Sequence, residues 1–144
     1  MKIEVEVLEK ITSEVVEAFD RLLPQLSTSA PPLDAAMLSA IISAPASTIL
    51  LARADGQIVG TLTLAMFPIP TGVRAWIEDV VVDEAARGQR VGEALTVEAV
   101  RLAHEAGART VDLTSRPSRA AAGRLYERVG FELRESRLYR YQIP

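Results

Sequence analysis

The sequence predicts an α/β domain in which a mixed, mostly antiparallel central β-sheet of about six to seven strands is flanked by about four helices. Three strand-like segments follow one another in the middle of the chain, which is typical of an antiparallel meander. Strand-like and helix-like segments then alternate, and each strand–helix–strand crossover requires parallel neighbours. Because 144 residues is the size of one domain, we expect residues 1–144 to form a single domain.

The expected elements are, in order, a strand at residues 3–8, helices at 13–23 and 34–42, strands at 48–54, 58–67 and 74–83, a helix at 92–106, a strand at 109–115, a helix at 117–129 and one or two strands within 132–143. Alternating apolar and charged residues indicate the first strand. The two early helices have Ser13 and Asp34 as candidate N-caps. Pro24 should end the first of them, and Pro45 limits the second.

Turn residues define the later elements. Asp55-Gly56 is among the strongest short hairpin signals, and a second turn at residues 68–72 joins the next two strands. The helix that begins near Gly92 has one apolar face and should end at Gly107. The following helix should end at Gly130, and alternating aromatic and aliphatic residues indicate the final strands.

Composition argues against several classes of protein. The chain has no cysteine, so it has no disulfide framework, no thiolate nucleophile and no cysteine-ligated zinc, and a single histidine, His104, argues against a histidine-based metal site. A net charge of -3 argues against a nucleic-acid partner. The N-terminal sequence has neither the apolar core of a signal peptide nor the length of a membrane span. We therefore expect a cytoplasmic protein with no metal, no nucleic acid and no membrane partner.

The most informative segment is Val80–Leu95, VVVDEAARGQRVGEAL. Its valines indicate a buried strand, and a helix begins shortly afterwards. The turn between them, residues 87–92, combines two glycines and two arginines with the positive dipole end of the following helix. These features suit an anion such as a diphosphate. Glycine-rich turns also commonly connect a strand to a helix without binding a ligand. The turn by itself therefore leaves open whether it is an anion site or an ordinary connection.

The same segment resembles motif A of the GNAT acetyltransferase superfamily, whose loop has the pattern Gln/Arg-x-x-Gly-x-Gly/Ala. Arg87, Val91 and Gly92 fit this pattern, whereas Arg90 takes the place of the first glycine and is a candidate for an added phosphate contact. The resemblance implies a sheet splayed between its fourth and fifth strands, with a β-bulge near residues 80–82. It also implies that acetyl-CoA is the cofactor and is bound by Val80, Val81, Val82, Arg87, Gly88, Gln89, Arg90, Val91, Gly92 and Glu93.

Residues 113–131, LTSRPSRAAAGRLYERVGF, have an ordinary interpretation as a strand and a glycine-ended helix in which Tyr126 is a core aromatic. They also resemble GNAT motif B, Asn-x-x-Ala-x-x-x-Tyr-x-x-x-Gly-Phe, at positions Ala122, Tyr126, Gly130 and Phe131. Arg119 stands at the asparagine position, where it is a candidate for a phosphate contact instead. The resemblance adds three residues to the expected acetyl-CoA site, namely Ser115, Arg119 and Tyr126.

Acetyl transfer from a thioester to an amine needs a neutral amine, donors for the developing oxyanion and a proton for the departing thiolate. A phenol is protonated at neutral pH, so Tyr126 is the expected acid. The backbone N–H of Val80 is the expected oxyanion donor. Glu78 is the expected base, because residues 76–82 resemble the Ile-Glu-Asp-x-x-Val stretch of glucosamine-phosphate acetyltransferases. Strand alternation would place Glu78 and Asp79 on opposite faces, and both could instead be solvated edge charges.

We therefore expect an enzyme that moves the acetyl group of acetyl-CoA to a primary amine of a small molecule, by direct attack in a ternary complex. Two alternatives stay open: a protein N-terminal or lysine acetyltransferase, which would act on a peptide amine, and a non-catalytic acyl-CoA-binding sensor module. The sequence does not indicate the acceptor. The apolar tail at residues 138–143 predicts a homodimer, because an exposed hydrophobic strand edge tends to pair.

Overall fold

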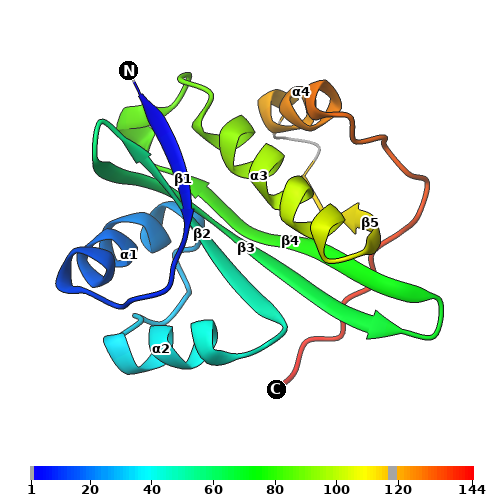
Figure 1. Cartoon of the computed structure of the whole chain (residues 1–144), viewed down its shortest axis with the longest axis horizontal. Helices are drawn as coiled ribbons and strands as arrows, with labels where there is room; N and C mark the ends of the chain where they lie inside the picture. Colours follow the sequence, from blue (N-terminus) through cyan, green and yellow to red (C-terminus); the bar gives the residue numbers. More distant parts are fainter. Residues whose placement is uncertain (1, 117–119) are drawn as a thin grey trace. The chain divides into compact units, whose positions relative to one another are not determined.

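The computed structural model describes residues 2–116 and 120–144 of the chain. They form two compact units, Met1–Thr114 and Ser115–Pro144, and each unit is described by itself. Along the chain the elements (Figure 1) are β1 (Ile3–Val7), α1 (Ser13–Leu26), α2 (Ala35–Ser43), β2 (Ser47–Ala54), β3 (Gln57–Ile69), β4 (Gly72–Val82), the 3₁₀-helix η1 (Glu84–Ala86), α3 (Val91–Glu105), β5 (Ala108–Asp112) and α4 (Ala120–Val129).

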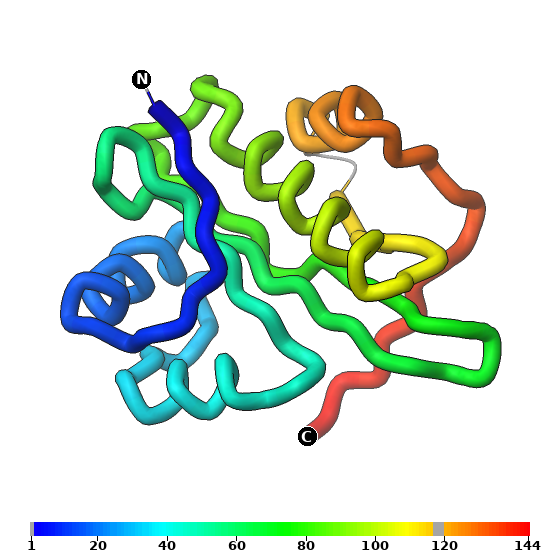
Figure 2. Tube along the Cα trace, in the orientation of Figure 1, coloured from blue at the N-terminus to red at the C-terminus, as the bar shows by residue number. Residues whose placement is uncertain are grey.

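The first unit is built on one sheet whose five strands lie in the order β1-β2-β3-β4-β5. The neighbours from β1 to β4 are antiparallel, and β4 and β5 are parallel. β3 and β4 form a long hairpin, which the tube in Figure 2 shows in green. The predicted fold class, a mixed and mostly antiparallel sheet with flanking helices, is therefore confirmed, although the described sheet has fewer strands than expected.

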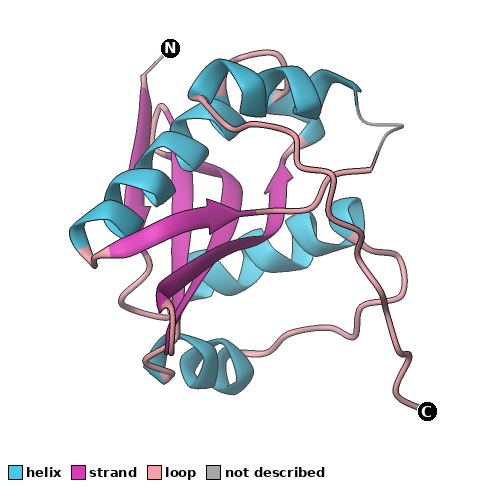
Figure 3. Cartoon of the chain, turned by 90° about the vertical axis from the view of Figure 1, so that its right-hand side faces the viewer, coloured by secondary structure: helices cyan, strands magenta, loops and turns pink. Residues whose placement is uncertain are grey.

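Helices cover both faces of the sheet in the first unit (Figure 3). On one face, α1 and α2 pack on a core of buried apolar side chains that includes Phe19, Leu22, Leu38, Leu51 and Val81. On the other face, α3 lies close to β3 at Gly60. A Cβ atom at Gly60 would lie 3.1 Å from Val91 and 3.2 Å from Leu95, so the absence of a side chain lets the helix approach the strand.

Local turn and cap signals act largely as expected. Asp55 and Gly56 both have positive φ, 48° and 89°, as a two-residue hairpin of this type requires. The carboxylate of Asp34 accepts a hydrogen bond from the N–H of Met37 at 2.8 Å, so Asp34 caps α2 as predicted. Gly107 and Gly130 also have positive φ just beyond their helices, 84° and 118°.

α1 begins at Ser13 as predicted, but its predicted N-cap and its predicted C-terminal end are wrong. Thr12 is the N-cap in place of Ser13, because its hydroxyl accepts a hydrogen bond from the N–H of Val15 at 3.2 Å. The helix also continues past Pro24 to Leu26. A proline so close to a helix end removes one hydrogen bond only, and the next turn still closes through the bond from the N–H of Ser27 to the Leu23 carbonyl at 2.9 Å.

The second unit consists of α4 and an irregular tail. The predicted strands within residues 132–143 do not form, and apolar side chains of the tail are largely exposed, with Leu133 at 94% and Tyr139 at 86%. A strand gains its stability from a ladder with a neighbour, and the described residues of this unit contain no other strand. The predicted start of the last helix at Pro117 falls outside the described residues.

Candidate functional site

β4 is irregular where the expected catalytic residues lie. Glu78 and Val81 of β4 pair with two residues of β3 that are only two positions apart, so β4 accommodates one extra residue between them. Asp79 lies in this interval and has a left-handed backbone, with φ of 49°. This is the pattern of a β-bulge, and it lies slightly before the expected position at residues 80–82.

The bulge places Glu78 on the same face of the sheet as Val81, whereas in a regular strand two residues three positions apart lie on opposite faces. Directly paired residues of a sheet share a face, so Glu78 and Val81 lie on one side of the sheet although three positions separate them. Val81 is 5% exposed and belongs to the core beneath α1 and α2. Glu78 is exposed, so its carboxylate is accessible to a ligand that approaches from solvent on the α1 side of the sheet. The regular alternation expected across Glu78 and Asp79 is interrupted here.

One edge of β4 is open beyond its middle. Within the described strands, the pairing of β4 with β5 ends at Trp76 and Asp112. Arg74 secures this last pairing, because its guanidinium lies 5.9 Å from the centre of the Trp76 ring and 3.6 Å from the Asp112 carboxylate. Residues 77–82 continue without a β5 partner, and Val80 lies among them. An extended ligand could pair with such an edge.

A connector, Asp83–Ala86, leads from β4 to the expected anion-binding loop. The carboxylate of Asp83 accepts hydrogen bonds from the N–H of Ala85 at 3.2 Å and from Nε of Arg21 at 3.1 Å. These bonds, that of Ala85 first, together with one from Gln25, hold the pKa of Asp83 below its ordinary value. Asp83 is therefore charged at neutral pH and fixed between α1 and the loop.

The loop has an open face and an unusual backbone. Gly88 has φ of 80°, and no heavy atom of the described residues, apart from Gly88 and its two chain neighbours, lies within 4 Å of the position that its Cβ would occupy. Arg90 is the N-cap of α3 and also has a left-handed backbone, with φ of 63°. Arg90 stands where the motif has glycine, the residue that adopts this conformation without strain. For arginine the conformation costs about 1 kcal/mol.

The start of α3 is suited to an anion. Helix geometry leaves the first backbone N–H groups of a helix without intrahelical acceptors, and the N–H of Ala94 is the first to reach back, to the Arg90 carbonyl at 3.1 Å. Arg87 and Arg90 have side chains 57% and 74% exposed, and their contacts to Glu84 and Glu93 are 3.9 Å and 3.2 Å. A guanidinium has five donors, so a single acidic neighbour leaves donors available for a diphosphate.

In the second unit, Tyr126 is part of the C-terminal cap of α4. Its carbonyl accepts hydrogen bonds from the N–H groups of Gly130 at 3.1 Å and Phe131 at 2.9 Å. The rings of Tyr126 and Phe131 meet edge to face with centroids 5.8 Å apart. This is a Schellman motif with its apolar contact, and it accounts for the Tyr-x-x-x-Gly-Phe spacing but not for the hydroxyl group. Ser115 is exposed, and Arg119 lies outside the described residues.

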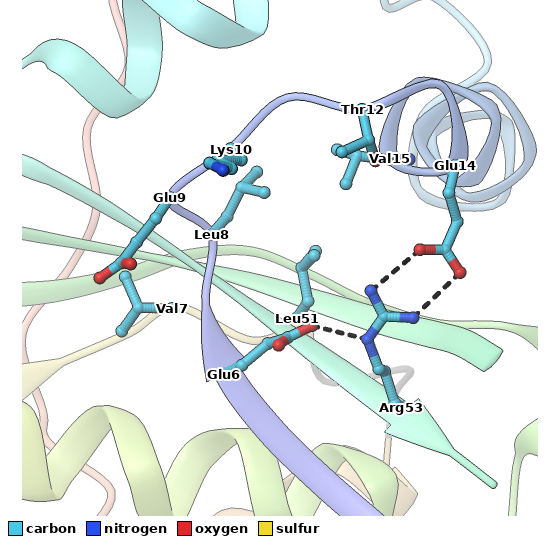
Figure 4. A pocket seen from close by; sticks show the side chains of 10 residues that line it. All are labelled: Glu6, Val7, Leu8, Glu9, Lys10, Thr12, Glu14, Val15, Leu51 and Arg53. Carbon is cyan, nitrogen blue, oxygen red and sulfur yellow. Dashed lines mark hydrogen bonds and ion pairs between the residues drawn. The ribbon is translucent and has the colours of Figure 1, made fainter. Parts of the chain in front are cut away.

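Two hollows in the first unit lie away from β4. One, of about 290 Å³, lies between β1 and the start of α1 (Figure 4). In it Arg53 donates to Glu6 at 2.6 Å and to both carboxylate oxygens of Glu14 at 3.0 Å, which lowers the pKa of Glu14. Because these charges satisfy one another, the cluster ties α1 to the sheet rather than offering a binding site. The other hollow, of about 680 Å³, lies between β1 and α3 and includes Gln89, Arg90 and Glu93.

Within residues 2–116 and 120–144, no group of three or more His, Cys, Asp or Glu side chains is arranged to hold a metal ion. Among the helices of those residues, none has the length and apolar character needed to cross a bilayer.

Comparison with known proteins identifies relatives over nearly the whole chain. A model of the acetyltransferase (GNAT) family matches residues 12–131. A candidate acetyltransferase from Agrobacterium tumefaciens str. C58 is 27% identical, with 96% of this chain and 99% of that chain covered and a TM-score of 0.84. An acetyltransferase from Trypanosoma brucei is 29% identical, with coverage of 99% and 100% and a TM-score of 0.79.

A third structure is similar in fold alone. It is AAC(6')-Iy in complex with the bisubstrate analogue CoA-S-monomethyl-acetylneamine, which is 19% identical, with coverage of 100% and 99% and a TM-score of 0.78. No curated protein sequence matches the chain significantly.

Proposed function

Because the chain belongs to the acetyltransferase (GNAT) family, whose members are acetyl-CoA-dependent acetyltransferases, we propose that it moves the acetyl group of acetyl-CoA to a primary amine of a small molecule. The reaction would be a direct attack in a ternary complex. The proposal depends mainly on one observation: an open, bulged strand edge at residues 77–82 is followed, one connector later, by a loop suited to a diphosphate. Since the family match spans 12–131, we also propose that both units form one catalytic domain.

The chain offers contacts for each part of acetyl-CoA. The backbone amides of residues 88–92 and the guanidiniums of Arg87 and Arg90 would hold the diphosphate. The open edge of residues 80–82 would pair with the amide groups of the pantetheine arm, as an added strand does. From the second unit, we assign supporting contacts to Ser115, Arg119 and Tyr126.

Three groups would share the chemistry. The bound co-substrate supplies the thioester. The carboxylate of Glu78 would take the proton of the amine, directly or through a water molecule. The backbone N–H of Val80 would donate a hydrogen bond to the carbonyl oxygen as negative charge develops on it. The hydroxyl of Tyr126 would donate its proton to the departing thiolate. A small-molecule acceptor is favoured by the fold-level relative AAC(6')-Iy, whose bound analogue joins CoA to acetylneamine.

The function is tested in two steps. Calorimetry with coenzyme A should give saturable binding to the wild-type protein. A thiol-release assay with acetyl-CoA and a panel of small amines should then give turnover that depends on the amine. Turnover only with peptides would favour the protein acetyltransferase alternative. Binding of coenzyme A without turnover on any amine would favour the sensor alternative, and no binding at all would contradict the proposal.

Changing Gly92 to valine should weaken coenzyme A binding severely, by about 100-fold or more, because a branched side chain would stand beside the first amides of α3. Calorimetry measures the affinity. Valine is no worse than glycine for helix formation, so thermal stability should not fall with the affinity. Gly92→Ala is the matched control, since the motif accepts alanine there, and it should bind nearly normally. Equal affinities for the valine variant and the wild type would place the diphosphate elsewhere.

We further propose a homodimer that uses the apolar tail. Leu138, Tyr139, Tyr141 and Ile143 are 65% to 86% exposed, which is unusual for side chains of this size in a stable monomer. Light scattering over a concentration series should therefore give the mass of a dimer. A monomer mass at the highest concentration would contradict this assembly.

A further inference from the structure

One turn of α1 reaches across to the connector that precedes the loop. Nη2 of Arg21 donates to the Ile58 carbonyl at 2.7 Å while its Nε donates to Asp83 at 3.1 Å. Four residues later on α1, the side-chain oxygen of Gln25 accepts a hydrogen bond from the backbone N–H of Glu84 at 2.8 Å. The amide nitrogen of Gln25 donates back to the Arg21 backbone carbonyl at 3.1 Å, which fixes the Gln25 side chain against the backbone of α1.

The backbone N–H groups of the connector are all hydrogen-bonded, and one of them bonds to α1. Each backbone N–H from Asp83 to Arg87 has an acceptor, in order the Val59 carbonyl, Oε1 of Gln25, Oδ1 of Asp83, the Asp83 carbonyl and the Glu84 carbonyl. Four of these acceptors belong to the connector itself or to the neighbouring strand β3. The remaining acceptor comes from α1, so α1 completes a set that the connector alone would leave incomplete.

The loop that follows has few ties of its own. Gly88 has open space on its side-chain face, and the Arg90 side chain makes no capping hydrogen bond to α3 but donates to the Glu93 carboxylate at 3.2 Å. At its far end the loop is anchored by α3, where Val91 is buried and Thr96 donates to the Gly92 carbonyl at 2.7 Å. The connector therefore determines where the N-terminal end of the loop lies and how its backbone is oriented.

We propose that Arg21 and Gln25 are positioning residues that hold the connector so that residues 88–92 present their amides in the geometry a diphosphate needs. This inference rests on the proposed function of that loop. Backbone amides bind an anion well only when they are fixed before binding, because otherwise the ordering entropy reduces the affinity. The Arg21 side chain is 48% exposed, and ion pairs at such positions contribute little to stability. The expected effect is therefore on affinity rather than on folding.

The experiment compares Arg21→Met, Gln25→Met and the double variant with the wild type. Calorimetry with coenzyme A should show the double variant about 5-fold to 30-fold weaker, and each single variant less affected. In turnover assays the KM for acetyl-CoA should rise in parallel, while kcat at saturating acetyl-CoA and the KM for the amine should stay within about twofold. Arg21→Lys restores the charge opposite Asp83 and should recover part of the affinity.

Arg53→Met is the matched control. Arg53 also joins α1 to the sheet, but it does so through Glu14 at the start of the helix, whereas the residues that contact the connector lie in its second half. It should lower thermal stability at least as much as Arg21→Met and leave the affinity for coenzyme A unchanged. If the wild type binds coenzyme A and the double variant binds equally well, the positioning role is wrong and the proposed function stands. If affinity falls equally in Arg53→Met, the effect is a general loss of stability, which also overturns the inference. If the wild type does not bind coenzyme A, both the positioning role and the proposed function are wrong.

Discussion

Replacing Tyr126 with phenylalanine should lower kcat by about 10²-fold to 10⁴-fold while the affinity for coenzyme A changes little, because that is the usual contribution of general acid catalysis. The change removes only the hydroxyl. The carbonyl of residue 126 still accepts the capping bonds of α4, and the ring still meets Phe131 edge to face. Steady-state kinetics with an active amine, and calorimetry with coenzyme A, measure the two quantities separately.

Phe131→Leu supplies the control for this variant. It removes the edge-to-face contact but keeps the Tyr126 hydroxyl, so it should lower stability and have a much smaller effect on kcat. A tyrosine that serves only the cap would give the opposite result. Tyr126→Phe would then turn over normally and lose at most about 1 kcal/mol of stability from a missing hydrogen bond. In that case the thiolate leaves without a proton from the protein.

The fold was predictable where short-range chemistry decides it. Asp55-Gly56 specifies a hairpin because both residues accept positive φ, and Asp34 caps its helix through a bond only three residues away. Tertiary packing decided the rest. α1 continues past Pro24 to Leu26, and Leu26 packs against the core. Local helix propensity alone would end the helix at the proline. The tail has the alternation of a strand, but a strand also requires a partner that local sequence cannot supply.

The candidate site likewise has parts that local sequence predicts and parts that depend on tertiary contacts. The loop at residues 87–92 was predictable, because glycines, arginines and a helix start are all local signals. The bulge at Asp79 was expected only approximately, since its position depends on the pairing of β4 with β3. The contacts of Arg21 and Gln25 with the connector were missed altogether. They join residues 62 and 59 positions apart, and no pattern in α1 distinguishes these two polar residues from solvated ones.

Glu78→Gln should lower kcat/KM by about 10²-fold near neutral pH, because the carboxylate that removes the proton of the amine is lost while its shape is kept. An amine acceptor is mostly protonated at that pH, since a lysine-like amine has a pKa near 10.4. As the pH rises toward the pKa of the amine, more of it arrives neutral and the base is needed less. The ratio of wild-type to variant rates should therefore shrink steadily with increasing pH, which a pH profile of kcat/KM measures.

Asp79→Asn is the matched control, because it neutralises the adjacent exposed carboxylate at the bulge, and asparagine tolerates the positive φ of this position. If Glu78 is the base, its variant shows the rescue at high pH, and Asp79→Asn retains most of the activity across the range. A rate loss in Asp79→Asn with the same pH rescue, and none in Glu78→Gln, would assign the base to Asp79. Normal turnover in both variants would leave proton removal to water and reduce the two carboxylates to solvated charges at the open edge of β4.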